Sequence, residues 1–422
     1  MKFLRIGICA LVAFGVLTHG GVEEWARACF ETGAGVLFVG WAIGLLRSSE
    51  ENIVISPLLP PLVALLLVVL GQLAFFTTDS PFATHEEFRL LLADTLVLFL
   101  AAQAFRTLED WREFVWFVMI FGFLVATFGI LQHLTFNGKL YWFREMHYGG
   151  IPFGPYVNRN HFAGFAELFI PMALVPLMLG KVRRERLFIV GLFAVVSIGS
   201  LFLAASRGGV ISFAVQVVVI VGWMAFRRTG TSQMLVGAAV LLAALLMVSW
   251  LGVKEITQRF STMKAMEVAS GKRASMRKDT WQIFLDHPWM GTGLGTLQTV
   301  FPPYETQYDG RIVNHSHNDY VEALADTGVA GGLCCALFLG LLLFHSLTLL
   351  SGNSSPFATV LNLSGLVGCI GFLVHSFADF NLHLPANALL FFLMALLATS
   401  TLNAFEANTR ESKAGRRRKG KH

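Results

Sequence analysis

Long apolar runs separated by short polar segments fill most of the chain. A membrane-spanning helix needs about 20 predominantly apolar residues, and about twelve runs approach that length. The pattern therefore predicts spanning helices over residues 4–20, 32–47, 53–76, 88–106, 112–132, 161–180, 187–205, 209–226, 233–252, 328–350, 357–376 and 386–402.

The first two runs are less clear as membrane helices than the others. Residues 4–20 follow basic residues as the core of a signal peptide does, but no clear small-residue cleavage site follows them. Residues 32–47 are short for a span. We expect both to be membrane helices.

Composition agrees with this pattern. Of the 422 residues, 55% are hydrophobic and 14% are charged, and the mean hydropathy is +0.62. Soluble domains carry about 25% charged residues. We therefore predict an all-α polytopic membrane protein and exclude a cytosolic enzyme, a disordered chain and a disulfide scaffold. The five cysteines have neither metal nor disulfide spacing.

The formal net charge of +5 is better explained by topology than by nucleic-acid binding. When successive loops are assigned alternately to two sides, most Lys and Arg of the short loops fall on one side. The loops at 133–160 and 253–327 fall on the other side. The positive-inside rule then places both termini in the cytoplasm and these two loops outside.

The predicted helices divide the chain into four parts. Residues 1–252 hold helices 1–9, residues 253–327 form a long outer loop, residues 328–402 hold helices 10–12, and residues 403–422 form a basic cytoplasmic tail. No internal repeat is present.

The long outer loop is expected to carry short helices. Residues 273–285 have helical spacing. The glycines at 291, 293 and 295 then break the helix and are interpreted as a plain turn. A second helix is predicted from about His317 to Thr327, ending at Gly328.

Polar residues near the predicted helix ends gather on the outer side. Charges within or beside spanning helices are unfavourable in lipid, so they are candidates for function. Scattered structural residues would not need to share one face of the membrane. The outer group contains Asn158, Arg159, Asn160, His161, Arg207, Arg273, Arg277, Asn314, His315, His317, Asn318, Asp319, His375, Asp379, Asn381 and His383.

Two arginines of this group are candidate anion ligands, and each has a plainer interpretation. Arg207 precedes two glycines between apolar runs. A lone Arg there commonly reaches toward lipid headgroups, whereas the glycines would let an anion approach backbone N–H groups. Arg277 shares a predicted helix face with Trp281. It is either a solvated charge or a phosphate ligand through its planar guanidinium.

His315 and His317 form the strongest local signal. Two histidines near an aspartate suit a metal, but helix positions two apart do not share a face, so no metal site is predicted. His317 at a helix start could act as a general base, since imidazole exchanges protons near neutral pH. The alternative is a helix cap by Asn314 or His315.

Two acidic residues, Asp94 and Glu167, fall inside predicted helices. They either form a proton path or pair with polar neighbours, and the sequence supports both interpretations equally.

Four segments, in this order and spacing, resemble the O-antigen ligase family. They are residues 158–164 (NRNHFAG), 206–209 (SRGG), 277–293 (RxxxW, then HPxxGxG) and 315–322 (HSHNDYVE). Residues 379–383 (DFNLH) also resemble many members. The superfamily includes O-antigen polymerases and protein O-oligosaccharyltransferases, and the resemblance is densest over residues 150–332.

The resemblance implies a membrane glycosyltransferase of the GT-C type. Such enzymes move a glycan from an undecaprenyl diphosphate carrier to an acceptor hydroxyl on the periplasmic face of the bacterial inner membrane, with no nucleotide sugar, cofactor or required metal. By matching position, Arg207 and Arg277 would hold the diphosphate, and His317 would deprotonate or orient the acceptor. The supporting residues would be His315, Asn318, Asn160, His161 and Asp379.

The acceptor and the competing classes stay open. Lipid A–core, a second lipid-linked glycan and a protein are all compatible acceptors, with ligation as the first hypothesis and polymerisation as the second. A transporter or flippase of lipid-linked glycans would predict inverted repeats and polar groups near the bilayer midplane. A structural scaffold would not need Arg and His around an outer loop. Membrane lipids are expected partners, and nucleic acid is not.

Overall fold

The computed structural model describes residues 1–47, 52–75, 77–145, 151–228, 230–261, 263–308, 310–352 and 355–401. The regular elements in these ranges are helices, accompanied by two isolated bridges. The predicted all-α fold is confirmed. The predicted tail at 403–422 lies outside the described residues.

Eight helices in the described ranges are long and apolar enough to cross a membrane, which fits the predicted polytopic membrane protein. They are α2 (Glu24–Arg47), α5 (Leu108–Leu134), α6 (Arg159–Met178), α7 (Leu187–Leu203) with the 3₁₀ turn η1 before it (Arg184–Arg186), α8 (Arg207–Phe226), α9 (Thr231–Ser261), α12 (Asp319–Ser351) and α13 (Pro356–His375).

The other four predicted spans are also helical. They are α1 (Lys2–Leu17), α3 (Leu59–Ala74), α4 (Pro81–Ala104) and α14 (Pro385–Thr399). Three of them have only 15 or 16 residues, and α4 carries charges in its first half. Since these four fall short in length or apolarity, the total of twelve spans stays a prediction.

The helices α6, α13 and α14 form the centre of the bundle. Almost every residue of α6 and α14 is buried, and α13 packs against both of them and against α8. Glycines let the backbones approach: a Cβ at Gly365 would lie 2.7 Å from the Met394 carbonyl oxygen, and one at Gly368 would lie 3.3 Å from that of Leu168. Small residues allow such close packing between membrane helices.

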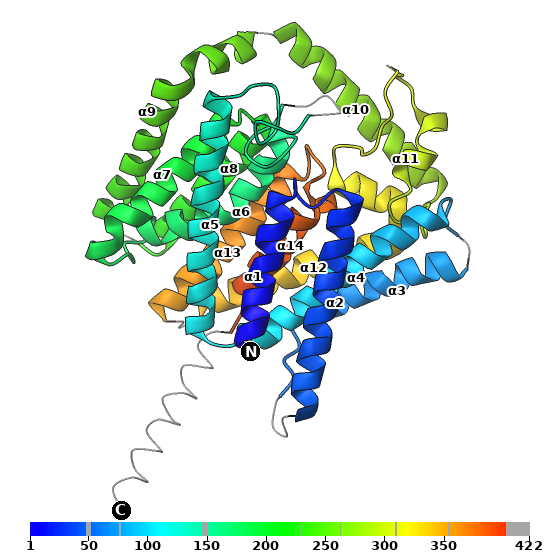
Figure 1. The fold of residues 1–422 in the computed structure, drawn as a ribbon, viewed down its shortest axis with the longest axis horizontal. Helices are drawn as coiled ribbons and strands as arrows, with labels where there is room; N and C mark the ends of the chain where they lie inside the picture. Colours follow the sequence, from blue (N-terminus) through cyan, green and yellow to red (C-terminus); the bar gives the residue numbers. More distant parts are fainter. Residues whose placement is uncertain are drawn as a thin grey trace, which may run out of the picture.

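The segment after α8 forms an arch. The helix α9 continues past residue 252 to Ser261, and α10 (Met263–Asp286) follows it. Figure 1 shows the two helices arching over the upper end of the bundle. The predicted helix at 273–285 is confirmed, because α10 contains it. The short α11 (Leu297–Val300) comes next.

The glycine turn before α11 is confirmed as a turn. Gly291, Gly293 and Gly295 have φ of +68°, +113° and +77°, a region that glycine enters without strain. The N–H groups of Thr292 and Gly293 donate to the carbonyl groups of Ala325 and Asp326 at 3.0 and 2.9 Å. The turn is therefore docked against the first part of α12.

The helix α12 starts later than predicted. Asn318 is the N-cap, and its side chain accepts hydrogen bonds from the N–H groups of Tyr320 and Val321. His317 has φ of +55°, which a right-handed helix cannot contain. The helix therefore begins at Asp319, shortly after the predicted start at about His317, and the alternative in which Asn314 or His315 caps it is wrong.

The predicted break at Gly328 is confirmed. The backbone there has φ +61° and ψ −162°, so the helix is interrupted before it continues to Ser351.

Candidate active site

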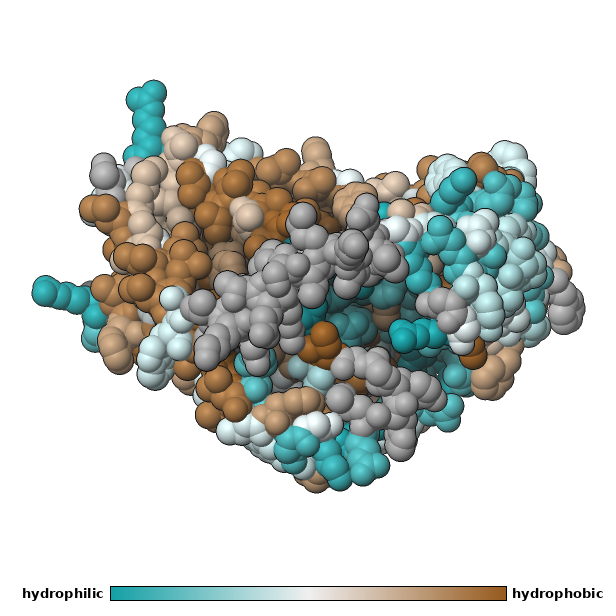
Figure 2. Space-filling view, turned by 90° about the horizontal axis from the view of Figure 1, so that it is seen from above, coloured by the Kyte–Doolittle hydropathy of each residue, from teal (hydrophilic) through white to brown (hydrophobic). Residues whose placement is uncertain are grey.

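Several helix ends meet at one end of the bundle, and the polar residues lie at these ends. Asn158 caps α6, Ser206 caps α8, Asn318 caps α12, and His375 ends α13. A short turn follows His375 and leads into the 3₁₀ helix η3 (Asn381–His383) and then α14. Seen from above in Figure 2, this end is hollowed, with hydrophilic residues inside the hollow and along its right side.

The centre of the site is the buried carboxylate of Asp379. Its Oδ1 lies 3.1 Å from Nδ1 of His317, and its Oδ2 accepts a 2.7 Å hydrogen bond from the Asn160 amide. The ring Nε2 of His161 lies 3.8 Å from Oδ1. Three residues predicted to act together thus meet one carboxylate, although His317 and Asp379 stand 62 positions apart in the chain.

The charge of Asp379 is well supported. Burial by itself would raise the pKa of this carboxyl, but the hydrogen bond with His317 and the neighbouring histidines outweigh it, so the pKa lies well below its usual range. The carboxylate is fully buried, whereas the His317 side chain is 23% exposed. A fixed negative charge therefore lies behind an imidazole that reaches the surface.

Phe380 separates the histidines. Its ring lies 4.8 Å from His161, 4.2 Å from His315 and 5.0 Å from His317, measured between ring centroids. This apolar ring lies against all three imidazoles and limits their movement. The residues 379–383 thus supply both a carboxylate and a packing surface.

His315 belongs to a second cluster. Its Nδ1 lies 2.7 Å from Oε1 of the buried Glu322, and Nε2 of His383 lies 3.4 Å from the same oxygen. The other oxygen, Oε2, accepts hydrogen bonds from the N–H and the hydroxyl of Ser316. His315 and His317 therefore contact different carboxylates.

His315, Glu322 and His383 are also the group that could hold a metal ion. Their ligand atoms lie within 4.8 Å of one another, and two imidazoles with a carboxylate suit zinc. Oε1 of Glu322 contacts these two imidazoles, whereas Oε2 accepts the hydrogen bonds from Ser316. The three side chains thus form a hydrogen-bonded cluster.

Arg207 is the first residue of α8 and is exposed. Its glycine neighbours have a packing role that sequence reasoning missed. A Cβ at Gly208 would lie 2.5 Å from the His375 ring, and one at Gly209 would lie 2.7 Å from Ala163 Cβ. The Gly209 N–H donates to the Ser206 hydroxyl. The glycines thus bring Arg207 close to the end of α13.

Arg277 lies on α10, one helical turn after Arg273. The guanidinium of Arg273 donates a 3.1 Å hydrogen bond to the carbonyl oxygen of Ala378, which precedes Asp379. Arg277 is partly buried. Neither Arg207 nor Arg277 makes an ion pair with any residue that the structure describes.

The turn between α13 and η3 connects the candidate residues. His317 reaches it through Asp379, the start of α8 reaches it through Gly208 and His375, and α10 reaches it through Arg273. Within the described ranges, no hydrogen bond or ion pair joins Arg207, Arg277 and His317. Two of them are linked to the common segment only through neighbours, Arg207 through Gly208 and Arg277 through Arg273.

Glu167 pairs with a polar neighbour, as one of the two interpretations of this residue expected. Its Oε1 lies 2.9 Å from Nδ1 of His375, and both side chains are buried. For Asp94, Oδ1 is buried and has no hydrogen bond to the described part of the chain.

Sequence reasoning did not identify Glu322 and His383 as partners of His315, or Glu167 as the partner of His375. Glu322 stands inside the quoted 315–322 segment, so its presence was visible. Its pairing with His383 depends on α12 and η3 packing together, which no local pattern reveals.

One protein-family profile matches part of the chain. The profile of the family described as O-antigen ligase matches residues 192–336. The matched part includes Arg207, Arg277, His315 and His317. No curated protein matches the chain. The match supports the O-antigen ligase family and, more broadly, a membrane glycosyltransferase of the O-antigen ligase or polymerase type.

Proposed function

We propose that the protein transfers a glycan from undecaprenyl diphosphate to an acceptor hydroxyl at the periplasmic face of a bacterial inner membrane. The observation that carries this proposal is the partly exposed His317 held by the buried Asp379. The match of residues 192–336 to the O-antigen ligases supports it.

His317 acts as the general base. Because Nδ1 is bonded to Asp379, that nitrogen carries the proton and Nε2 keeps a free lone pair. The carboxylate fixes this tautomer and stabilises the imidazolium that forms when Nε2 takes the hydroxyl proton. Asn160 holds the second oxygen of Asp379 and so orients the pair.

Arg207 and Arg277 stabilise the leaving group. As the bond to the carrier breaks, negative charge grows on the diphosphate, and preorganised cations lower the energy of that state. Neither guanidinium is neutralised by a described acidic residue, so both are available to phosphate oxygens. Planar guanidinium groups bind such oxygens in pairs.

The reaction is a direct displacement. The acceptor O–H gives its proton to Nε2, its oxygen forms a bond to the anomeric carbon, and the carbon–oxygen bond to the diphosphate breaks. Undecaprenyl diphosphate leaves, and the configuration at the anomeric carbon is inverted. The chain needs no covalent glycosyl intermediate.

Ligation to lipid A–core is the first choice of acceptor, since the matching family profile is that of the ligases. Polymerisation onto a second lipid-linked glycan is the alternative within the same superfamily, followed by transfer to protein. A carrier of lipid-linked glycans is the non-enzymatic alternative.

A transfer assay with purified protein tests these proposals. The donor is an undecaprenyl diphosphate-linked glycan, and lipid A–core, a second lipid-linked glycan and a protein are offered separately, with chelator present. Wild type is compared with Arg207→Ala, Arg277→Ala and His317→Ala. The matched controls are Arg184→Ala and His345→Ala, since these residues lie away from the site.

We expect transfer to one acceptor, lost in His317→Ala and strongly reduced in the two arginine variants, while the controls keep full activity. The acceptor used then identifies the reaction. If wild type transfers to none of them but moves the lipid carrier across vesicles, the protein is a transporter and the proposal is wrong.

A further inference from the structure

A second polar cavity lies at the opposite end of the same helices. It has a volume of about 850 Å³ and lies between the start of α5, the end of α6, the start of α7 and the start of α13. The helices α6 and α13 present their other ends to the candidate active site. The cavity therefore faces the other side of the membrane.

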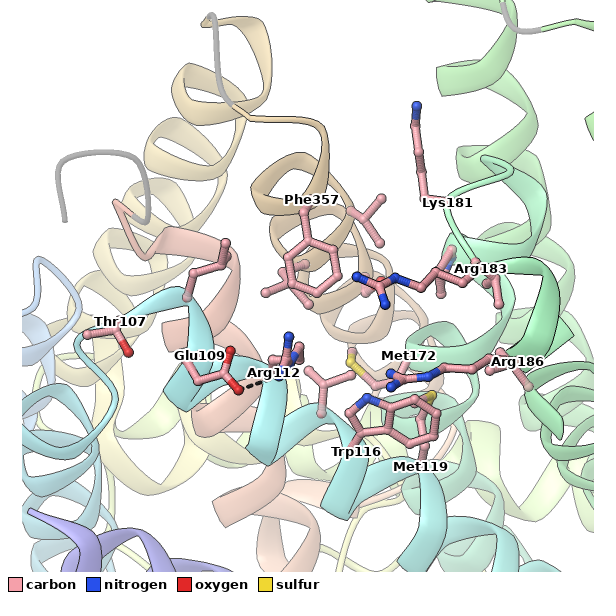
Figure 3. Close-up of a pocket in the computed structure, with 18 residues that line it drawn as sticks. Thr107, Glu109, Arg112, Trp116, Met119, Met172, Lys181, Arg183, Arg186 and Phe357 are labelled. Atoms are coloured by element: carbon pink, nitrogen blue, oxygen red, sulfur yellow. Dashed lines mark hydrogen bonds and ion pairs between the residues drawn. The ribbon is translucent and has the colours of Figure 1, made fainter. Parts of the chain in front are cut away.

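Basic residues surround the mouth of this cavity. Arg112, Lys181, Arg183 and Arg186 line it, together with one acidic residue, Glu109. Figure 3 shows Arg183 and Arg186 reaching from the loop after α6 toward Arg112 on α5, while Lys181 points away. Glu109 pairs with Arg112, and Glu185 lies 3.8 Å from Arg183. Four basic residues against these two acidic ones still leave an excess of positive charge at the mouth.

The walls below the mouth are apolar. Trp116, Met119, Met172 and Phe357 form much of this surface, and Figure 3 shows them beneath and beside the arginines. The Arg186 guanidinium lies over the Trp116 ring, 5.3 Å from its centre, so this charge is held beside the apolar wall. Charge at the rim and apolar surface below match a molecule with an anionic head and a hydrocarbon tail.

We propose that this cavity binds one anionic phospholipid of the inner leaflet, with the phosphate on Arg183 and Arg186 and an acyl chain along the apolar wall. Arginine forks bind phosphate oxygens, and basic pockets between membrane helices on the cytoplasmic side bind anionic headgroups. A free phosphate ion would leave the apolar wall without a partner. The cavity volume lies within the usual range for ligand sites, roughly 300–1,000 Å³.

Native mass spectrometry of the full-length protein tests this site. Phosphatidylglycerol, phosphatidylcholine, undecaprenyl phosphate and inorganic phosphate are offered separately. Wild type is compared with the double variants Arg183→Ala/Arg186→Ala and Arg183→Lys/Arg186→Lys. Arg184→Ala is the matched control, because it removes a charge from the same 3₁₀ turn but does not line the cavity.

We expect wild type to retain phosphatidylglycerol in preference to phosphatidylcholine. The double alanine variant should bind phosphatidylglycerol about 10-fold more weakly or worse, since each lost charged hydrogen bond weakens binding by that order. The lysine variant should keep part of the affinity, and Arg184→Ala should match wild type. Melting temperatures of the variants verify that each is folded.

Three results would overturn the proposal. Equal retention of phosphatidylcholine would show that the rim does not select charge. Undiminished binding of phosphatidylglycerol in the folded double alanine variant would place the lipid elsewhere. Preferential binding of undecaprenyl phosphate or inorganic phosphate, lost in the same variants, would identify a different ligand. Because binding is measured without the transfer reaction, each of these results is independent of the proposed catalytic function.

Discussion

At the scale of single residues, the pairing of His317 with Asp379 determines what the site can do. An imidazole alone can adopt either tautomer, and only one of them leaves Nε2 free as a base. Asp379 selects that tautomer through its 3.1 Å contact with Nδ1. The carboxylate is thus a positioning group for His317.

Asp379→Asn should therefore lower kcat by about 10²- to 10⁴-fold, as expected when an amide replaces the carboxylate behind a catalytic histidine. The KM for the donor should change little, because Asp379 is buried and does not reach the diphosphate. Steady-state kinetics of transfer measure both constants. A loss confined to KM, or full activity in the folded variant, would contradict the role of Asp379.

The low pKa of Asp379 predicts how stability responds to pH. A carboxyl whose pKa is lowered on folding stabilises the protein above its unfolded pKa of about 4, and the contribution is lost as pH falls toward the folded pKa. The melting temperature of wild type should exceed that of Asp379→Asn from about pH 8 to pH 5. The difference should shrink below about pH 4. A difference that already shrinks between pH 7 and pH 5 would contradict the lowered pKa.

Residue identities were visible in the sequence, but their partners were not. Asp379 and His317 were both singled out, yet their contact depends on the turn after α13 meeting the segment before α12. The same holds for His315, whose partner His383 comes from η3. Pairing across such distances is a property of packing, which local patterns do not encode.

At the scale of elements, hydrophobic runs predicted a helix at each of the twelve positions, because helix length in a membrane follows from bilayer thickness. Helix ends were less well predicted. The helix α12 begins after the predicted start, with Asn318 as its cap, because His317 adopts a left-handed backbone conformation. The packing role of glycines was the hardest feature to predict, since Gly208 and Gly209 allow neighbouring helices to approach closely.

Gly328 should be intolerant of any side chain. Its φ of +61° and ψ of −162° belong to a region open essentially to glycine, and strain there amounts to about 1–3 kcal/mol. A Cβ would also lie 2.4 Å from the Trp289 carbonyl carbon. We expect Gly328→Ala to lower the melting temperature and to reduce transfer, since the first part of α12 carries Glu322.

Gly340→Ala is the matched control for that experiment. Gly340 lies in the same helix, and a Cβ there has no neighbour within 4 Å. Alanine in a helix interior is favoured over glycine by about 0.5–1 kcal/mol, so this variant should melt at or slightly above the wild-type temperature. Equal melting temperatures for Gly328→Ala and Gly340→Ala would refute the role of the bend.

At the scale of the whole molecule, the two polar sites lie at opposite ends of shared helices. The candidate catalytic residues surround the C-terminal end of α13, and the basic cavity surrounds its N-terminal end. The positive-inside rule assigns the basic end to the cytoplasm. Both proposals therefore depend on one orientation, with the transfer site outside and the phospholipid site inside.

That orientation is open to a direct test by cysteine labelling. The background replaces the five native cysteines by serine, and single cysteines are introduced at Lys139, Ile312 and Arg184. At the end that holds the candidate active site, the Lys139 side chain is 43% exposed and Ile312 is exposed, and Arg184 is exposed at the end that holds the basic cavity. A membrane-impermeant maleimide should label the first two in cells with only the outer membrane opened. It should reach Arg184→Cys only after the inner membrane is opened.

The reverse result would invert the topology and place His317 in the cytoplasm, where a periplasmic acceptor cannot reach it. Labelling of all three from one side would mean that the α5–α6 region does not cross the membrane as predicted.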